Sequence, residues 1–267
     1  CHQTVSRSSM AGRERSRSPR QEIQLQPGSK LPCCVLFGGP ASGKTTLGRH
    51  LQSQLPGFVH VSSGDLARLV TPFEGSPFLS SIARQLADRR RRKVAFARLT
   101  EVLHKVVAEA VNANPVWGII IDGLRPAELP GFQRVVGCNL VAVIKLSCPA
   151  SEMLVRLQQR DHREGDERLG LSEMDPLSRI KAFEERDGAE IDALQDVFRD
   201  AFLSLDTSTG HSTVEALAQQ IIDFAEPLRE ARVSKALPSP TEISWRAVIG
   251  AVASKLDQEY HPDGKPR

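Results

Sequence analysis

Residues 31–45 read Leu-Pro-Cys-Cys-Val-Leu-Phe-Gly-Gly-Pro-Ala-Ser-Gly-Lys-Thr. Residues 33–37 form a short apolar run that ends at two glycines, which is typical of a buried strand followed by a tight turn. Residues 45–55 are predicted to continue as a helix, so residues 38–45 match the P-loop pattern in the strand–turn–helix context that it requires. The backbone N–H groups of such a turn cradle phosphate oxygens at a helix N-terminus.

Two side chains of this loop carry further chemistry. Lys44 can reach the β- and γ-phosphates of a nucleotide, and the Thr45 hydroxyl can ligate Mg²⁺. The nucleotide contacts that the loop predicts are Gly38, Gly39, Pro40, Ala41, Ser42, Gly43, Lys44, Thr45 and Thr46. GTPases, transport ATPases and small-molecule kinases all have such a loop, so the loop alone does not name a reaction.

The rest of the chain alternates strand and helix signals. Further apolar strands are predicted at 58–62, 117–121, 141–146 and 201–205, and further helices at 99–111, 151–160 and 213–224. Five strands separated by helices predict an α/β fold, here a P-loop NTPase fold with a five-stranded parallel sheet flanked by helices. The functional loops of such a sheet lie at the carboxyl ends of its strands.

The positive charge of the chain is concentrated at its start. The net charge is +3, but residues 1–30 carry six bases and two acids, which leaves residues 31–267 with a net charge of −1. Residues 1–30 contain little that a core could bury, so we expect a disordered Ser/Arg-rich tail, with a phosphorylatable or RNA-contacting arm as the alternative. The near-neutral body and an aromatic content of 5% argue against a nucleic-acid binder.

The cysteines and apolar runs favour an intracellular location. The five cysteines form no CxxC pair and have no metal-ligand spacing, so buried reduced thiols are expected, with Cys33 and Cys34 on opposite faces of their strand. No stretch of sequence approaches the ~20 apolar residues of a membrane span. We expect a cytoplasmic protein that does not enter a membrane, with an organelle transit peptide at the Ser/Arg-rich start as the alternative.

Several segments between about residue 31 and residue 227 together resemble the nucleoside monophosphate kinase family, which includes adenylate kinase and UMP-CMP kinase. The P-loop is similar to the family's GGPGSGKGT, with Ala41 and Thr45 in place of two glycines. Residues 60–68 read His-Val-Ser-Ser-Gly-Asp-Leu-Ala-Arg and resemble the family's H-(I/L)-S-(T/A)-G-D-x-L-R. The resemblance implies that Ser63, Gly64 and Arg68 hold the acceptor nucleotide, with Arg68 on its α-phosphate.

A third segment, residues 119–123, resembles the family's strand that ends in DGFPR. An acid at the end of an apolar strand beside a P-loop can orient the waters of Mg²⁺, so Asp122 is expected to bind this ion through water. The chain then departs from the family, because Arg125-Pro126 exchanges the order of Pro and Arg. Gly123 and Arg125 remain candidates for the acceptor site, with the role of Arg125 open.

Four arginines later in the chain match the family's lid region. Arg156 and Arg160 lie at i and i+4 of one predicted helix and so face the same way. The resemblance implies that Arg156 lies over the adenine of ATP and that Arg160 touches its phosphates. Arg168 and Arg179 have the spacing of the family's lid arginine and of the arginine in its R-(I/L) segment. Seven residues separate Arg160 from Arg168, which implies a short lid at about 160–170 without a zinc-bearing domain.

Two further departures lie in these regions. The family's Asp-Asp pair falls on Gly170-Leu171, and Glu173 or Asp175 are the candidate substitutes. Residues 89–93 read Arg-Arg-Arg-Arg-Lys, where the family has a glycine, apolar residues and usually a proline. This run is a solvated helix edge, a phosphate-attracting rim or a nucleic-acid patch. Since the stretch contributes to base selection in the family, the sequence does not choose between AMP, CMP and UMP, and AMP is our first expectation.

The resemblance also divides the chain. It implies a kinase domain at 31–228, with an acceptor-binding part at about 62–98, followed by a C-terminal extension at 229–267. In the extension, Leu237-Pro238-Ser239-Pro240 is predicted to be a linker, and residues 245–256 are a candidate helix that packs back on the core.

The implied reaction is reversible transfer of the γ-phosphoryl group of Mg-ATP to a nucleoside monophosphate, by a monomer with Mg²⁺ as its cofactor. The positive charge around the transition state is expected from Lys44, Arg125, Arg160, Arg168 and Arg179. The expected acceptor contacts are Ser63, Gly64, Arg68, Gly123, Arg125, Arg168 and Arg179. A nucleotide-binding protein of this fold with weak or no transfer, or another P-loop small-molecule kinase, are the alternatives.

Overall fold

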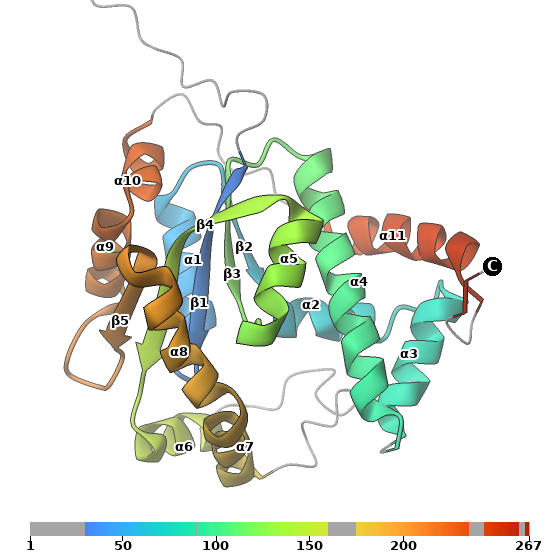
Figure 1. Cartoon of the computed structure of the whole chain (residues 1–267), viewed down its shortest axis with the longest axis horizontal. Helices are drawn as coiled ribbons and strands as arrows, with labels where there is room; N and C mark the ends of the chain where they lie inside the picture. The colour runs from blue at the N-terminus through green and yellow to red at the C-terminus, as the bar shows by residue number, and fades with distance from the viewer. Residues whose placement is uncertain (1–29, 89, 160–174, 235–242, 262–264, 267) are drawn as a thin grey trace, which may run out of the picture.

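The computed structural model describes residues 30–88, 90–159, 175–234, 243–261 and 265–266. Five parallel strands form its central sheet in the order β2-β3-β1-β4-β5 (Figure 1). The strands are β1 (Leu31–Gly38), β2 (Phe58–Ser62), β3 (Gly118–Asp122), β4 (Cys138–Ser147) and β5 (Phe202–Asp206). All five predicted strands are confirmed, and with them the predicted P-loop NTPase fold. The order also places the carboxyl ends of β2, β3 and β1 side by side.

The helices are α1 (Lys44–Gln54), α2 (Ser63–Val70), α3 (Pro77–Ala87), α4 (Arg92–Ala113), α5 (Leu129–Val136), α6 (Ala150–Gln158), α7 (Pro176–Phe183), α8 (Ala189–Phe198), α9 (Val214–Phe224), α10 (Glu226–Val233) and α11 (Trp245–Glu259), with short turns η1 (Pro126–Glu128), η2 (Glu184–Gly188) and η3 (Arg199–Ala201). Helix α4 begins at Arg92, seven residues before the predicted start, because part of the basic run continues the helix.

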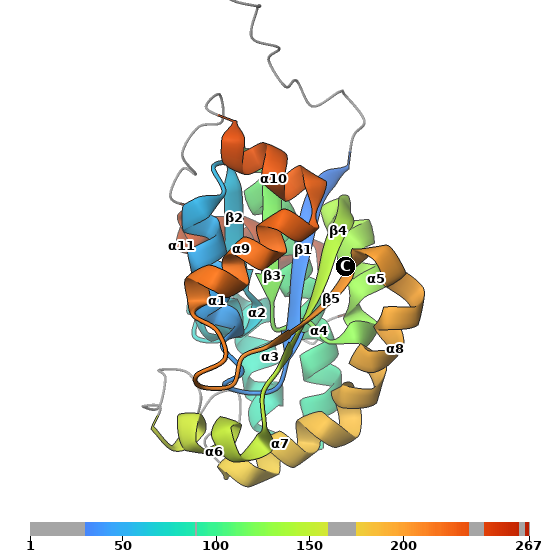
Figure 2. The same ribbon diagram turned by 90° about the vertical axis from the view of Figure 1, so that its left-hand side faces the viewer.

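Helices cover both faces of the sheet (Figure 2). Cys33, Val35 and Phe37 of β1 belong to the core that includes α4, α5 and α8. Cys34 and Leu36 belong to the opposite core, with α1, α9 and α10. This alternation follows from the two-residue period of a strand, and it confirms that the adjacent cysteines point to opposite faces.

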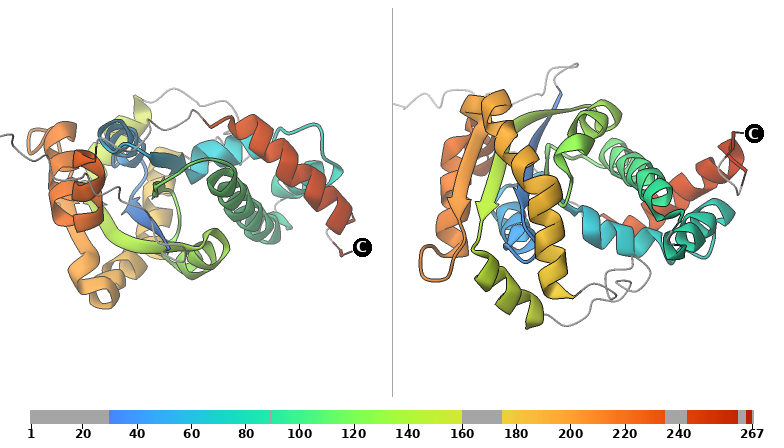
Figure 3. Two further views of the ribbon diagram at one scale, coloured as in Figure 1. Left: turned by 90° about the horizontal axis from the view of Figure 1, so that it is seen from above. Right: turned by 60° about the horizontal axis from the view of Figure 1, so that its bottom comes forward.

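Helices α2, α3 and α4 form an arm beyond the β2 edge of the sheet, and α11 lies across them (Figure 3). The predicted C-terminal helix is therefore present, although it packs on this arm rather than on the sheet. Ile249, Val252 and Leu256 of α11 are buried there. Its Asp257 accepts hydrogen bonds from Ser76 Oγ at 3.0 Å and from Phe78 N at 2.9 Å, at the N-terminus of α3. The extension thus stabilises the start of an arm helix.

Cysteine burial agrees with the expected reduced thiols. Cys33, Cys34 and Cys138 are buried and unbridged, and Cys148 is half-buried. Burial raises the pKa of Cys34 to about 12, so its thiol stays protonated. Among the described residues, no helix combines the length and the hydropathy needed to cross a bilayer. The predicted linker at 237–240 and nearly all of the predicted tail fall outside the described ranges.

Candidate nucleotide site

The P-loop joins β1 to α1 through three unusual backbone conformations. Gly38 has a φ of +148° and Gly43, the N-cap of α1, has a φ of +91°. A Cβ on Gly38 would lie 2.6 Å from the carbonyl oxygen of Leu146, so only glycine fits there. Ala41 adopts a φ of +59°, which costs a residue with a side chain roughly 1 kcal/mol. The family's glycine at this position is explained by that conformation.

Lys44 lies inside the loop that it is expected to complete. Its Nζ donates to the carbonyl oxygens of Gly38 at 2.8 Å and of Gly39 at 2.6 Å. Burial lowers the pKa of Lys44 to about 8, and the negative charge of Asp122 opposes that shift. The ammonium group is therefore charged at neutral pH, and its partners in this state are neutral carbonyl groups that phosphate oxygens can replace.

Asp122 ends β3 with a fixed orientation. It is 3% exposed, and its Oδ1 accepts a hydrogen bond from Ser62 Oγ at 3.1 Å. Its Oδ2 lies 2.9 Å from Nε2 of His60. Both partners are on β2, where Ser62 is paired in register with Asp122. The carboxylate is thus held at the shared carboxyl edge of β2, β3 and β1.

The residues expected at the Mg²⁺ site fit this ion chemically. Thr45, which is half-buried in the first turn of α1, offers a hydroxyl oxygen, and Asp122 offers a carboxylate. Mg²⁺ prefers such oxygen ligands and usually completes its shell with waters and substrate phosphates. In the described part of the chain, no group of three or more His, Cys, Asp or Glu side chains could hold a metal alone.

The predicted acceptor segment, residues 60–68, places Ser63 and Gly64 beside the end of β3 at Asp122 and Gly123. Ser63 and Gly64 open α2, directly after β2. Gly123 has a φ of +81°, and a Cβ there would lie 3.4 Å from Ser63 Cβ and 3.6 Å from Gly64 N. The turn after β3 therefore lies against the start of α2, and the structure brings these predicted residues together.

Two predicted acceptor arginines are each bound to a carboxylate. Arg68 Nη1 donates to Asp65 Oδ1 at 3.2 Å, and its side chain is 13% exposed. Arg125 donates to Glu128 Oε1 from Nε at 2.8 Å and from Nη2 at 2.5 Å. Glu128 Oε1 also accepts from Thr100 Oγ1 of α4 at 3.1 Å. The carboxylates occupy part of the hydrogen-bonding capacity of both arginines, so an incoming phosphate would either use their remaining N–H donors or replace the carboxylates.

Arg156 connects α6 to the P-loop. Its Nη1 lies 3.4 Å from the carbonyl oxygen of Ala41, and its Nη2 donates to that of Thr207, after β5, at 2.7 Å. Nη2 also pairs with Glu152 Oε1 at 2.8 Å. Arg156 therefore lies beside the P-loop, and its contact with ATP stays a prediction.

Helix α7 also contacts the loop. A Cβ on Gly39 would lie 2.4 Å from Met153 Sδ and 3.3 Å from the Phe183 ring, so α6 and α7 approach the loop closely. Arg179 is half-buried on α7 beside the buried Ile180. The predicted Arg179 is thus on an element that touches the loop.

The predicted lid at about 160–170 lies outside the described residues, and so do Arg160, Arg168 and Glu173. Asp175, the other candidate for the missing Asp pair, is the N-cap of α7. Hydrogen bonds from the hydroxyl and the amide of Ser178 lower the pKa of Asp175. Its carboxylate is therefore engaged in capping a helix.

Sequence reasoning missed the groups that hold the site arginines. Glu152 and Arg156 are i and i+4 on one helix, and Arg125 and Glu128 are three residues apart, so spacing was a usable signal for both pairs. The bond from Arg156 to Thr207 is to a backbone carbonyl that no residue type specifies.

Comparison with known proteins places these motifs in a family. A family model described as an AAA domain matches residues 37–171, about half of the chain. UMP-CMP kinase 2 of Caenorhabditis elegans is 31% identical over 137 residues, which are 49% of this chain and 68% of that protein. This chain belongs to the nucleoside monophosphate kinase family. Its P-loop, its acceptor segment and Asp122 all lie within the 37–171 match.

Two plant members of the nucleoside monophosphate kinase family give similar matches. UMP-CMP kinase of Prunus armeniaca is 30% identical over 153 residues, 55% of this chain and 62% of that protein. UMP-CMP kinase 2 of Oryza sativa subsp. japonica is 29% identical over 153 residues, 56% of this chain and 57% of that protein. The chain thus matches less than two thirds of the length of either plant relative.

Proposed function

We propose that this chain transfers the γ-phosphoryl group of Mg-ATP reversibly to a nucleoside monophosphate. The observation that carries this proposal is the shared edge of β1, β3 and β2. There, Lys44 of the P-loop and Ser63 of the acceptor segment lie on either side of Asp122 and Gly123. A P-loop by itself accounts for one bound nucleotide, whereas candidate phosphate-binding groups on both sides of this edge support a site for two.

On the donor side, the loop amides and Lys44 would bind the β- and γ-phosphates of ATP, with Arg156 beside the loop at Ala41. Thr45 would ligate Mg²⁺ directly, and Asp122 would hold one of its waters. The ion would neutralise charge on the transferred phosphoryl group. The bonds from Ser62 and His60 keep the Asp122 carboxylate in one orientation for that role.

On the acceptor side, Arg68 and Arg125 would bind the phosphate of the monophosphate, since a guanidinium fork matches phosphate oxygens. That phosphate is already an anion at neutral pH, so the reaction needs no strong general base. Catalysis would come from positioning and from positive charge around the in-line transition state, to which Arg160, Arg168 and Arg179 would add.

The relatives' names support a pyrimidine acceptor. All three are named UMP-CMP kinases, so we place UMP and CMP ahead of AMP, which the sequence alone put first. We propose further that the protein is a monomer and that it is located in the cytoplasm.

One specific observation favours an alternative function. Arg125 stands one position before its place in the family, and Glu128 binds its guanidinium group. If that pair does not open, the chain would bind ATP and a monophosphate while transferring little between them.

The test is an acceptor panel. The protein is incubated with Mg-ATP and with AMP, CMP, UMP or GMP separately, and diphosphate formation is followed. We expect phosphorylation of at least one monophosphate, with UMP or CMP fastest. ATP binding without any diphosphate product would reject the transferase and favour the alternative.

A further inference from the structure

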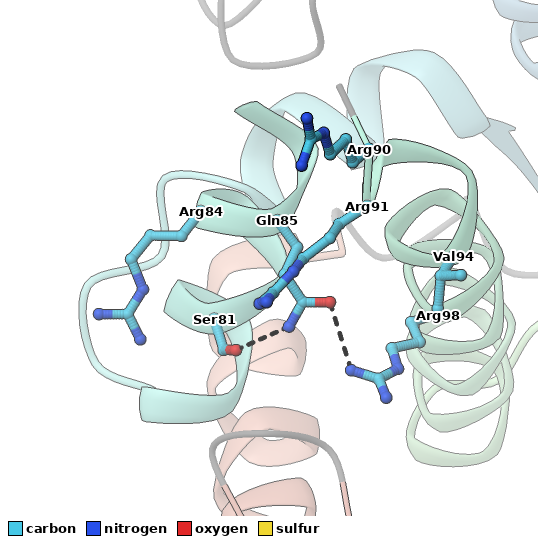
Figure 4. A pocket seen from close by; sticks show the side chains of 7 residues that line it. All are labelled: Ser81, Arg84, Gln85, Arg90, Arg91, Val94 and Arg98. Atoms are coloured by element: carbon cyan, nitrogen blue, oxygen red, sulfur yellow. Dashed lines mark hydrogen bonds between the residues drawn. The ribbon is translucent and has the colours of Figure 1, made fainter. Parts of the chain in front are cut away.

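An arginine-lined hollow of about 550 Å³ lies between α3 and α4, at the tip of the arm (Figure 4). We call it the arginine hollow. Its polar lining consists of Ser81, Arg84, Gln85, Arg90, Arg91 and Arg98. Gln85 lies in its middle, bound to Ser81 Oγ at 3.0 Å and 3.4 Å from Arg98 Nη1. Arg84 of α3 and Arg98 of α4 lie on opposite sides of this glutamine.

The arginine hollow is on a different face of the arm from the acceptor segment. Thr100 of α4 faces the nucleotide side, where it bonds Glu128. Arg98 lies seven residues, or about two turns, before Lys105, so the two share a helix face. Lys105 pairs with Glu259 of α11 at 3.5 Å. The hollow therefore continues the face on which α11 packs, away from the nucleotide site.

The same relation holds on α3. Phe78 contacts the ring of Tyr260, just after α11, with centroids 5.4 Å apart. Ser81 and Gln85 follow Phe78 at helical spacing on that face. Helix α11 thus covers one end of the groove between α3 and α4 and leaves the arginine end open.

Basic side chains far outnumber acidic ones in this region. Residues 81–98 contain seven bases and one acid, whereas residues 31–267 have a net charge of −1. The side chains of Arg84 and Arg90 are exposed and have no ion-pair or hydrogen-bonding partner within the described ranges, although the backbone N–H of Arg90 donates to Asp88 Oδ1 at 2.9 Å. Asp88, the one acid, lies 3.6 Å from Arg91. The N-terminus of α4 has no side-chain cap and adds its positive dipole end. Such a concentration of like charge is relieved by a bound polyanion.

We propose that the arginine hollow binds a small ligand that carries several phosphate groups, as a second site separate from the nucleotide site. Guanidinium groups from two helices would each bind a different phosphate, so the ligand would bridge α3 and α4. No aromatic residue is part of its lining. The stacking that single-stranded nucleic acid uses is therefore missing, which favours a compact phosphate chain over RNA.

The test titrates inorganic tripolyphosphate into the full chain by calorimetry, without nucleotide. The wild type should show two sites, because the P-loop also binds phosphates. Lys44→Ala should weaken one site, and the double variant R84Q/R90Q should weaken the other at least tenfold while its ATP affinity stays unchanged. The side chains of both replaced arginines are exposed and have no described partner, so this variant should keep the packing of α3 and α4. Arg229→Gln, an exposed arginine on α10, is the matched control and should keep both sites.

Three results would overturn the proposal. One is a single wild-type site that Lys44→Ala removes. Another is an equal loss of affinity in Arg229→Gln, which would mean attraction to net charge alone. The third is a single-stranded RNA that binds through Arg84 and Arg90 and is not displaced by tripolyphosphate, which would assign the surface to nucleic acid.

Discussion

The donor and acceptor halves of the site hold their phosphate-binding groups in different ways. In the proposed donor half, most of the candidate phosphate-binding groups are backbone amides of the P-loop, and Lys44 donates hydrogen bonds to the neutral carbonyl oxygens of Gly38 and Gly39. In the proposed acceptor half, the candidate phosphate-binding groups are arginine side chains, and each is bound to a carboxylate: Arg68 to Asp65 and Arg125 to Glu128. In the donor half phosphate oxygens would meet neutral groups, whereas in the acceptor half an incoming phosphate would meet arginines that are already paired with an anion.

This difference has a physical consequence. A guanidinium group paired with a carboxylate offers phosphate fewer N–H donors, and the carboxylate repels the incoming anion, so the net gain from phosphate binding is smaller. ATP should therefore bind without the acceptor, and the acceptor should bind more weakly alone.

Removing the donor lysine should have the largest effect. Lys44→Ala is expected to lower the turnover number ~10²–10³-fold, the usual loss when one transition-state donor is removed. The chain should remain folded, with an unchanged far-UV circular dichroism spectrum. Lys181→Ala, an exposed lysine on α7, is the control and should keep full turnover. Retained turnover in Lys44→Ala would contradict the phosphate role of this lysine.

Arg68→Ala should weaken use of the monophosphate without weakening the binding of ATP. A charge-assisted hydrogen bond is worth about 1.5–3 kcal/mol, and because Asp65 competes for Arg68 we expect the lower value, a fall in kcat/KM for the monophosphate of roughly tenfold. The Kd for ATP should not change. Arg134→Ala, an exposed arginine on α5, provides the comparison. Equal losses for ATP and for the monophosphate would mean that Arg68 supports the whole fold rather than the acceptor half.

The affinity for ATP should depend on pH through Lys44. The pKa of this lysine is about 8 without nucleotide, and bound phosphates favour its charged form and so raise that pKa. Affinity is then constant below pH 8 and falls as pH rises above it, by up to about tenfold per unit. Calorimetry between pH 7 and pH 9.5 measures this, together with proton uptake on binding. Lys44→Arg should bind with a flat profile over that range, and a wild-type profile that is equally flat would disprove the assignment.

The brace between α11 and the arm should give the smallest effect. Asp257→Ala removes the acceptor of the Ser76 and Phe78 bonds at the start of α3. Loss of a helix cap costs about 1 kcal/mol, which is roughly 2–4 °C in the midpoint of thermal unfolding for a domain of this size. Asp196→Ala, an exposed residue of α8, should leave the midpoint unchanged. A midpoint no lower in Asp257→Ala than in this control would show that α11 does not stabilise the arm.

The sequence predicted the donor half better than the acceptor half, for a reason visible in particular residues. The Gly-rich pattern predicts the positive φ values of Gly38 and Gly43, and Asp122 is easy to recognise because it ends an otherwise apolar strand. Helices α2, α5, α7 and α10 have eight residues each, which is too short for an apolar period to stand out. The bond from Arg156 to the carbonyl oxygen of Thr207 and the contact of Asp257 with α3 depend on tertiary packing, which spacing along the chain does not encode.

Binding of a bisubstrate compound tests whether the edge of β1, β3 and β2 holds two nucleotides at once. The compound joins adenosine to uridine or cytidine through five phosphates, so it can fill both halves at once. We predict that one molecule binds per chain in calorimetry, that ATP and UMP or CMP each compete with it, and that Lys44→Ala and Arg68→Ala both weaken it. If ATP competes but no monophosphate does, and Arg68→Ala binds as tightly as the wild type, then the edge of β1, β3 and β2 holds one nucleotide and the two-nucleotide site is wrong.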